Sequence, residues 1–243
     1  MSAKIAVAIM AAGKGTRMKT NLPKVLVKLK GRPLLSYVLD TAKSIVPEKI
    51  VVIVGHGREK IMNAFKDADV KFAVQEPQLG TAHAIIMAKE ALGGFSGDVV
   101  ILSGDVPLIK PETIKKLVEK RAETSSAITI LTITLDDAGA YGRIIRDGDA
   151  IVDLVEAKDA TDEQLAVKEI NSGIYSFDSV FLFDALGRIN NKNAQGEYYL
   201  TDLVKIAVAD GRLVTGVECD DHKEALGINT MDEIAKMEEL IGE

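Results

Sequence analysis

Short apolar runs alternate with longer amphipathic stretches in the first half of the chain. The runs are rich in β-branched residues and too short for helices, which is typical of buried strands. They cover residues 5–10, 50–54, 71–74, 99–103 and 127–134. Between them, apolar residues recur at helical spacing after Pro33 and again after Pro111. This alternation predicts an α/β fold with a Rossmann-like, doubly wound and mainly parallel sheet.

The pattern changes after about residue 140. Asp147-Gly148 separates two apolar stretches and indicates a β-hairpin. A strand is expected over residues 170–177, with helices near 200–209 and 231–241. This half is typical of α+β structure that closes over one side of a site.

We therefore expect residues 1–243 to form a single domain. Its expected parts are an α/β part at about 1–139, an α+β part at about 140–229 and a C-terminal helix at 230–243.

A glycine-rich segment follows the first predicted strand. It contains Gly13 and Gly15, and Lys14, Arg17 and Lys24 add positive charge. Glycine lets the main chain approach a ligand closely, and exposed backbone N–H groups bind phosphate oxygens. The segment lacks the Walker pattern G-x-x-x-x-G-K-[ST] and the third glycine of a dinucleotide fingerprint. It therefore predicts a phosphate-binding loop of another kind.

Three further polar segments follow predicted strands, at residues 75–83, 104–108 and 171–173. Ligands of open α/β sheets bind beyond the carboxyl ends of the strands. We expect the first two of these segments to meet the glycine-rich segment at one edge of the sheet, while 171–173 is expected to be a loop.

Asp105 follows an apolar run and could hold a divalent ion beside phosphates. Mg²⁺ takes few protein oxygens and fills its other positions with water and phosphate oxygens. The alternative is that Asp105 caps the next helix, although Pro107 and Pro111 place a turn between them. Both interpretations stay open at the level of the sequence.

Gly80-Thr81 begins an alanine-rich helix whose free N–H groups could bind an anion. An ordinary helix cap is the commoner explanation for these two residues. His83 lies in the first turn, where a single histidine is more often structural than catalytic.

Composition narrows the class of protein. The net charge of −6 argues against a general nucleic-acid surface. Cys219 is the single cysteine, so an internal disulfide is excluded, and we expect it to be an inert packed residue. No membrane-spanning run or signal peptide is evident, which favours a cytoplasmic protein. Neither a Ser/His/Asp or Cys/His arrangement nor a His/Cys metal cluster is recognisable, and the oligomeric state stays open.

The motifs together resemble the nucleotide-sugar pyrophosphorylase family. The glycine-rich segment with Leu22-Pro23-Lys24 by itself indicates only a nucleotidyltransferase. Over nearly its whole length the chain is similar to the uridylyltransferase domains of bacterial bifunctional N-acetylglucosamine-1-phosphate uridyltransferases. The segments that carry this similarity are 75–84, 104–108, 141–144, 155–160, 169–173 and 193–202.

The resemblance implies a role for individual residues. In the part at 1–139, the backbone of Ala11, Ala12 and Gly13 would hold the base and ribose of the nucleotide. Uracil would be read by the side-chain amide and backbone groups of Gln75, Gly80 and Thr81. Arg17 and Lys24 would be the catalytic cations that neutralise the phosphates of UTP and the departing pyrophosphate. Asp105 and Asn229 would ligate Mg²⁺. The sugar would be bound by Gly142, Glu156, Asn171 and Tyr199, all in the part at 140–229.

The implied reaction transfers UMP from UTP to N-acetylglucosamine 1-phosphate. A sugar phosphate oxygen attacks the α-phosphorus in line, pyrophosphate leaves, and UDP-N-acetylglucosamine, a cell-wall precursor, is formed. Such chemistry depends on positioning and charge neutralisation and needs no covalent enzyme intermediate.

Two departures from the resemblance matter. Ser103 stands where members of that group usually carry a larger aromatic residue, which leaves strict sugar preference open. The hexapeptide-repeat β-helix that performs acetyl transfer is not recognisable, so we expect no acetyltransferase activity.

Two alternative functions stay open. One is the same chemistry on another substrate pair, giving UDP-glucose or a dTDP-sugar. The other is a non-catalytic module that binds nucleotide sugars. The joint presence of Arg17, Lys24, Asp105 and Asn229 disfavours the module, since binding alone does not require them.

Overall fold

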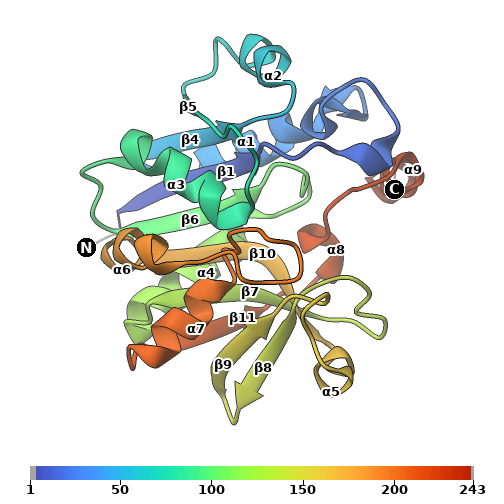
Figure 1. The fold of residues 1–243 in the computed structure, drawn as a ribbon. Helices are drawn as coiled ribbons and strands as arrows, with labels where there is room; N and C mark the ends of the chain where they lie inside the picture. The colour runs from blue at the N-terminus through green and yellow to red at the C-terminus, as the bar shows by residue number, and fades with distance from the viewer. Residues whose placement is uncertain (1–3, 242–243) are drawn as a thin grey trace.

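A computed structural model describes residues 4–241, so residues 1–3 and 242–243 of the expected domain lie outside the described residues. A large mixed sheet runs through the molecule, with helices on both faces (Figure 1). In spatial order its main strands are β11 (Val214–Glu218), β7 (Ile128–Thr134), β10 (Glu169–Asp178), β6 (Asp98–Ser103), β1 (Ile5–Ala11), β4 (Lys49–Val54) and β5 (Lys71–Val74). The expected α/β fold with a mainly parallel sheet is confirmed.

Among the seven main strands, β10 is the one that runs antiparallel to its neighbours. It lies between β6 and β7 and pairs antiparallel with both, whereas β1, β4, β5 and β6 are parallel to their neighbours within that group. The expected hairpin is present as β8 (Arg143–Asp147) and β9 (Ala150–Val155), with Gly148 in the turn at a φ of 57°. It joins the sheet where Arg143 pairs with Ile170 of β10.

Residues 171–173 are not the loop that the polar pattern suggested. They lie inside β10, at a register shift between Asn171 and Tyr175 in the pairing with β7. Gly173 has a φ of 79°, a backbone conformation that glycine adopts without strain. The irregularity keeps the strand paired on both sides of the polar segment.

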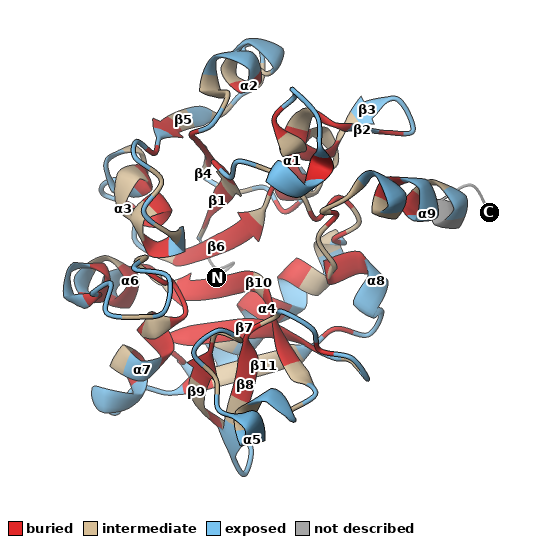
Figure 2. Cartoon of the chain, turned by 45° about the vertical axis from the view of Figure 1, so that its right-hand side comes forward, coloured by how far each residue is buried: buried red, intermediate tan, exposed pale blue. Residues whose placement is uncertain are grey.

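Alternating strand residues contribute to two hydrophobic cores, one on each face of the sheet. The central strands β6, β7 and β10 are largely buried (Figure 2). Ala6 and Ala8 of β1 contribute to one core, and Val7 and Ile9 contribute to the other, as the period of two in a strand requires. The first core is covered by α3 (Thr81–Leu92), α6 (Ser179–Ala185) and α7 (Asp202–Ala209). The second is covered by α1 (Leu34–Ser44), α2 (Arg58–Ala64) and α4 (Pro111–Thr124).

A third, smaller core anchors the C-terminal helix α9 (Met231–Ile241). Ile234 and Met237 of α9 belong to the same buried cluster as Met18, Leu29 and Leu34 near the start of the chain. Leu29 belongs to β2 (Lys28–Leu29), which forms a small hairpin with β3 (Arg32–Pro33). This packing brings the segment before α9 next to the glycine-rich segment.

The remaining elements are short. They are α5 (Asp162–Leu165), α8 (His222–Ala225) and the 3₁₀ turns Thr16–Met18, Lys24–Leu26 and Leu186–Arg188. Within residues 4–241, none of the helices combines the length and the apolar character needed to cross a bilayer.

A buried ion pair ties α4 to the sheet. Asp98, at the start of β6, is 1% exposed, and its carboxylate accepts hydrogen bonds from the guanidinium of Arg121. The hydroxyl of Ser176 in β10 donates to the same carboxylate at 3.3 Å. Removing one partner of such a pair leaves a desolvated charge without compensation.

We predict that Asp98→Ala lowers the free energy of unfolding by about 3–5 kcal/mol, because Arg121 then loses its buried counterion. Asp136→Ala serves as the matched control, since Asp136 pairs with Lys168 in solvent at 2.9 Å and such pairs add little. Urea unfolding of both variants measures the difference. Equal unfolding midpoints for the two variants would contradict the prediction.

Candidate active site

A cavity of about 570 Å³ lies at the carboxyl ends of β1 and β6. It collects predicted site residues from four separate stretches of chain. These are Ala11, Ala12, Gly13, Arg17, Lys24, Gln75, Gly80, Thr81, Asp105 and Asn229. The structure therefore brings together all residues expected to bind the nucleotide and the metal. Gln78, Ser103 and Glu197 line the same cavity.

The two glycines of the glycine-rich segment have different reasons to be glycine. Gly15 has a φ of 59°, and a Cβ atom added there would lie 2.7 Å from Cβ of Lys24. A larger residue would thus push Lys24 out of place. A Cβ atom added at Gly13 would meet nothing within 4 Å, so the main chain at Gly13 is open to the cavity. This is the close approach that a phosphate-binding loop needs.

A polar network joins four of the predicted residues. The Lys24 ammonium donates to the Asp105 carboxylate and to Oδ1 of Asn229, the latter at 2.6 Å. Arg17 Nη2 donates to the same Asn229 oxygen at 2.8 Å. Two cations therefore converge on the oxygens of one carboxylate and one amide in the lining of the cavity.

Asn229 is held firmly in this position. Its Nδ2 donates to the Gly227 carbonyl at 3.0 Å, and its backbone N–H donates to Oε2 of Glu233 at 2.5 Å. The neighbouring Ile228 N–H donates to the backbone carbonyl of Asp105 at 2.9 Å. The segment before α9 is thus bonded directly to the loop after β6.

The donor set fits a hard divalent cation. Oxygens of Asp105 and Asn229 already share one ammonium group, so they point toward a common position. Among residues 4–241 there is no group of three or more His, Cys, Asp or Glu side chains suited to a metal. A cation such as Mg²⁺ would then rely on water and phosphate oxygens for its other ligands, which is its usual preference.

The alternative that Asp105 caps α4 is wrong. The helix begins at Pro111, with Lys110 as its N-cap residue. The carboxylate of Glu224 accepts the Lys110 N–H at 3.0 Å and the Thr113 hydroxyl at 2.9 Å. Glu224 thus holds the start of α4 through these two bonds, while no side chain within residues 4–241 caps the free N–H groups of the first turn, and Asp105 lines the cavity instead.

The opposite end of the cavity is formed where β5 leads into α3. Gln75 follows β5, is 3% exposed, and donates from Nε2 to the Gly80 carbonyl at 2.8 Å. The Thr81 hydroxyl accepts the Leu200 N–H at 2.9 Å. A Cβ atom on Gly80 would lie 2.6 Å from the Tyr198 carbonyl oxygen, so glycine is required for this contact. The first turn of α3 is thereby joined to the segment that precedes α7.

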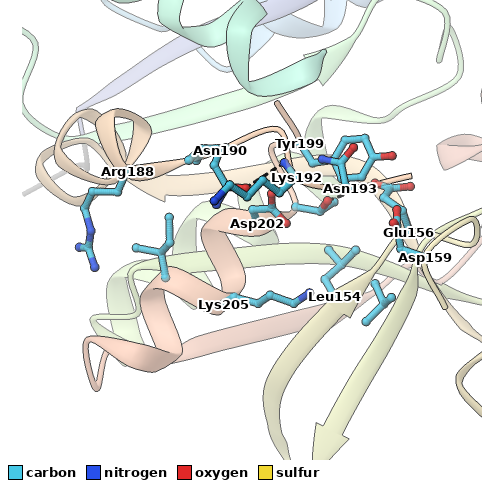
Figure 3. A pocket seen from close by; sticks show the side chains of 14 residues that line it. Leu154, Glu156, Asp159, Arg188, Asn190, Lys192, Asn193, Tyr199, Asp202 and Lys205 are labelled. Carbon is cyan, nitrogen blue, oxygen red and sulfur yellow. Dashed lines mark hydrogen bonds between the residues drawn. The ribbon is translucent and has the colours of Figure 1, made fainter. Parts of the chain in front are cut away.

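The four predicted sugar-binding residues do not share one cavity. Glu156 and Tyr199 line a second cavity of about 300 Å³. Figure 3 shows Glu156 and Asp159 at one end of this cavity and Arg188 at the other. Gly142 and Asn171 line neither cavity, but they are joined to each other, because the Asn171 N–H donates to the Gly142 carbonyl at 2.9 Å.

Tyr175 connects the two pairs of sugar-binding candidates. Asn171 Nδ2 donates to the Tyr175 hydroxyl at 2.6 Å. Burial raises the pKa of Tyr175, and the negative charge of Glu156 raises it further. Glu156 is thus close enough to Tyr175 to interact electrostatically, although the structure shows no direct hydrogen bond between Glu156 and Asn171 within the described chain.

Glu156 itself has a perturbed carboxyl group. Burial raises its pKa above the ordinary value of 4.5, and the charges of Asp159 and Asp202 act in the same direction. A hydrogen bond from the Thr201 hydroxyl to Oε1 at 3.2 Å opposes this shift. Thr201 was not recognised from the sequence as a site residue.

The folded state therefore binds the Glu156 proton more tightly than the unfolded chain. The contribution of Glu156 to the free energy of unfolding is greatest below pH 4.5. It falls as the pH rises through the raised pKa, because the buried carboxyl group then becomes charged. We predict that Glu156→Gln is more stable than the original protein at pH 8, and that this gain shrinks at pH 4. Urea midpoints at both pH values, with the exposed Glu123→Gln as control, measure the effect. A gain that does not depend on pH would disagree with this origin.

Known proteins are similar to this chain over most of its length. Residues 7–141 match the family described as "MobA-like NTP transferase domain". Three relatives are each named "Bifunctional protein GlmU". The relative from Syntrophotalea carbinolica is 43% identical over 98% of this chain and 51% of its own length. The relative from Thermus thermophilus is 46% identical over 96% of this chain and 51% of its own length, and the one from Streptomyces coelicolor is 44% identical over 98% of this chain and 50% of its own length. The chain spans about half the length of these curated relatives.

Proposed function

Because the chain belongs to the MobA-like NTP transferase domain family, we propose that it transfers UMP from UTP to N-acetylglucosamine 1-phosphate. The products are UDP-N-acetylglucosamine and pyrophosphate. The observation that carries this proposal is the convergence of Arg17 and Lys24 with Asp105 and Asn229 in the lining of the 570 Å³ cavity. The similarity to bifunctional GlmU proteins over 96–98% of the chain supports it.

The chemistry requires a phosphate oxygen of the sugar phosphate to attack the α-phosphorus of UTP. The bond between the α-phosphorus and the bridging oxygen breaks, and its electron pair leaves with pyrophosphate. In this proposal the main chain at Gly13 approaches the phosphates, while Arg17 and Lys24 neutralise the charge that develops on the leaving group. No side chain has to act as a nucleophile.

Asp105 and Asn229 would hold Mg²⁺ in this scheme. When bound, the ion supplies charge neutralisation and aligns the phosphates. Asn229 is kept in place by Gly227 and Glu233, and Lys24 holds both ligand oxygens toward the same point.

The two parts of the chain would divide the substrates. Residues 1–139 would bind the nucleotide through Ala11, Ala12, Gly13, Gln75, Gly80 and Thr81. Residues 140–229 would bind the sugar through Gly142, Glu156, Asn171 and Tyr199, with Thr201 supporting Glu156. The helix α9 would contribute by fixing Asn229.

A second candidate keeps the reaction and changes the sugar 1-phosphate or the nucleotide. The observation that favours it is Ser103, a small residue that lines the cavity at the end of β6. Space left by a small side chain at this point would admit a differently substituted substrate.

A panel of nucleoside triphosphates and sugar 1-phosphates with Mg²⁺ separates these functions, with pyrophosphate release as the readout. We expect the highest kcat/KM for UTP with N-acetylglucosamine 1-phosphate. A clear preference for another pair would favour the second candidate. Binding of UDP-sugars without any pyrophosphate release would instead indicate the non-catalytic module.

We predict that Arg17→Ala lowers kcat about 10²–10³-fold, since it removes a donor that faces developing charge. The unfolding midpoint should stay close to that of the original protein, because Arg17 is exposed. Lys28→Ala, an exposed cation in β2 outside the cavity, is the matched control and should keep full turnover. Near-normal turnover in Arg17→Ala would refute the role of this residue.

A further inference from the structure

The amide nitrogen of Gln75 has two partners, both from the start of α3. Nε2 lies 2.8 Å from the Gly80 carbonyl oxygen and 3.2 Å from Nδ1 of His83. Gln75 is almost completely buried, and both Gln75 and Gly80 line the 570 Å³ cavity. His83 is the third residue of α3 and is partly buried.

These contacts determine the orientation of the amide. The Gly80 carbonyl can only accept a hydrogen bond, so the atom facing it must be the Gln75 nitrogen. A rotated amide would place two oxygen acceptors 2.8 Å apart, without a hydrogen between them. With the nitrogen so placed, His83 Nδ1 must be an acceptor as well, and the histidine proton lies on Nε2. Burial lowers the pKa of His83, which favours this neutral form.

The Gln75 oxygen is then left for a ligand. Each amide hydrogen has an acceptor, and no donor to Oε1 is found among the described residues. Among the described residues, Thr132 Oγ1 is the fully buried side-chain atom that has no hydrogen-bond partner. Because Gln75 Oε1 also has no partner in this part of the chain but is not fully buried, part of its surface is accessible to a ligand. An acceptor at this position binds a base N–H group. Uracil carries a hydrogen on N3, whereas N3 of cytosine is itself an acceptor.

We propose that His83 is a positioning residue that fixes the Gln75 amide so that Oε1 accepts the N3–H of a uracil-type base, and that it thereby disfavours cytosine nucleotides. This inference rests on the proposed function and deepens it. His83 touches no substrate atom in this scheme and acts through Gln75. Thymine has the same N3–H, so His83 does not distinguish uracil from thymine nucleotides.

Two substitutions separate positioning from packing. His83→Leu removes the acceptor, whereas His83→Asn places Oδ1 near the position of Nδ1 and keeps an acceptor for Gln75 Nε2. His222→Leu changes an exposed histidine of α8 outside the cavity and serves as the matched control. The variants are compared by steady-state kinetics with UTP and CTP, and by calorimetric binding of each nucleotide.

We expect His83→Leu to raise KM for UTP about five- to tenfold, the effect of one lost hydrogen bond, with little change in kcat. Binding of CTP should not weaken, so the preference for UTP over CTP should narrow by a similar factor. His83→Asn should recover UTP binding to within about twofold of the original protein, since its acceptor replaces one neutral hydrogen bond by another. His222→Leu should be unchanged.

The outcomes that overturn this role are distinct from those that overturn the function. If the unsubstituted protein is active with UTP and His83→Leu has the same KM and base preference, the role of His83 is contradicted while the proposed function stands. If His83→Leu and His83→Asn weakened UTP binding equally, the imidazole ring would act by packing alone, which would also contradict the positioning role of His83. An original protein that neither binds nor turns over UTP would contradict the proposed function itself.

Discussion

The site depends on one ammonium group shared between two oxygens. Lys24 lies just after the glycine-rich segment, Asp105 follows β6, and Asn229 precedes α9. The Lys24 and Asp105 side chains are 14% and 25% exposed, so their charges are partly removed from water and need each other. This shared contact draws three distant stretches of chain to one point, and Arg17 adds a second cation through Asn229.

Hydrophobic packing makes this polar arrangement possible. The cluster that joins α9 to Met18 and Leu34 buries apolar surface, and this burial stabilises the position of the segment that carries Asn229. Elsewhere around the cavity, the Tyr198 N–H donates to the Leu79 carbonyl, and the Leu200 N–H donates to the Thr81 hydroxyl. These bonds dock the second half of the chain onto the start of α3. Both halves of the chain therefore bound the cavity, and the loss of either set of contacts would open the cavity.

The prediction of the fold succeeded where local patterns were strong. The apolar runs that became β1, β4, β6 and β7 are short, β-branched and buried on both faces, which few other structures allow. No residue range was predicted for β11, and α6 was not anticipated, nor were α2, α5, α8, β2 and β3. Each is short, and β11 is a strand because it pairs with β7. For α6 a local signal did exist, since the Asp178 carboxylate accepts the Phe181 N–H at 2.8 Å as an N-cap.

Local chain chemistry by itself predicted a phosphate-binding loop, because the conformational freedom of Gly15 and the polar residues after buried strands are properties of short segments. Resemblance to a known family added the roles proposed for individual residues. Three-dimensional packing decided the rest. It showed that Asp105 does not cap α4. It also separated the sugar-binding candidates into two pairs, with Glu156 and Tyr199 lining one cavity and Asn171 bonded to Gly142 outside it. The same packing placed His83 Nδ1 3.2 Å from the amide nitrogen of Gln75. Such contacts depend on which donor and acceptor groups the folded chain brings together, and the local sequence around each residue does not determine this.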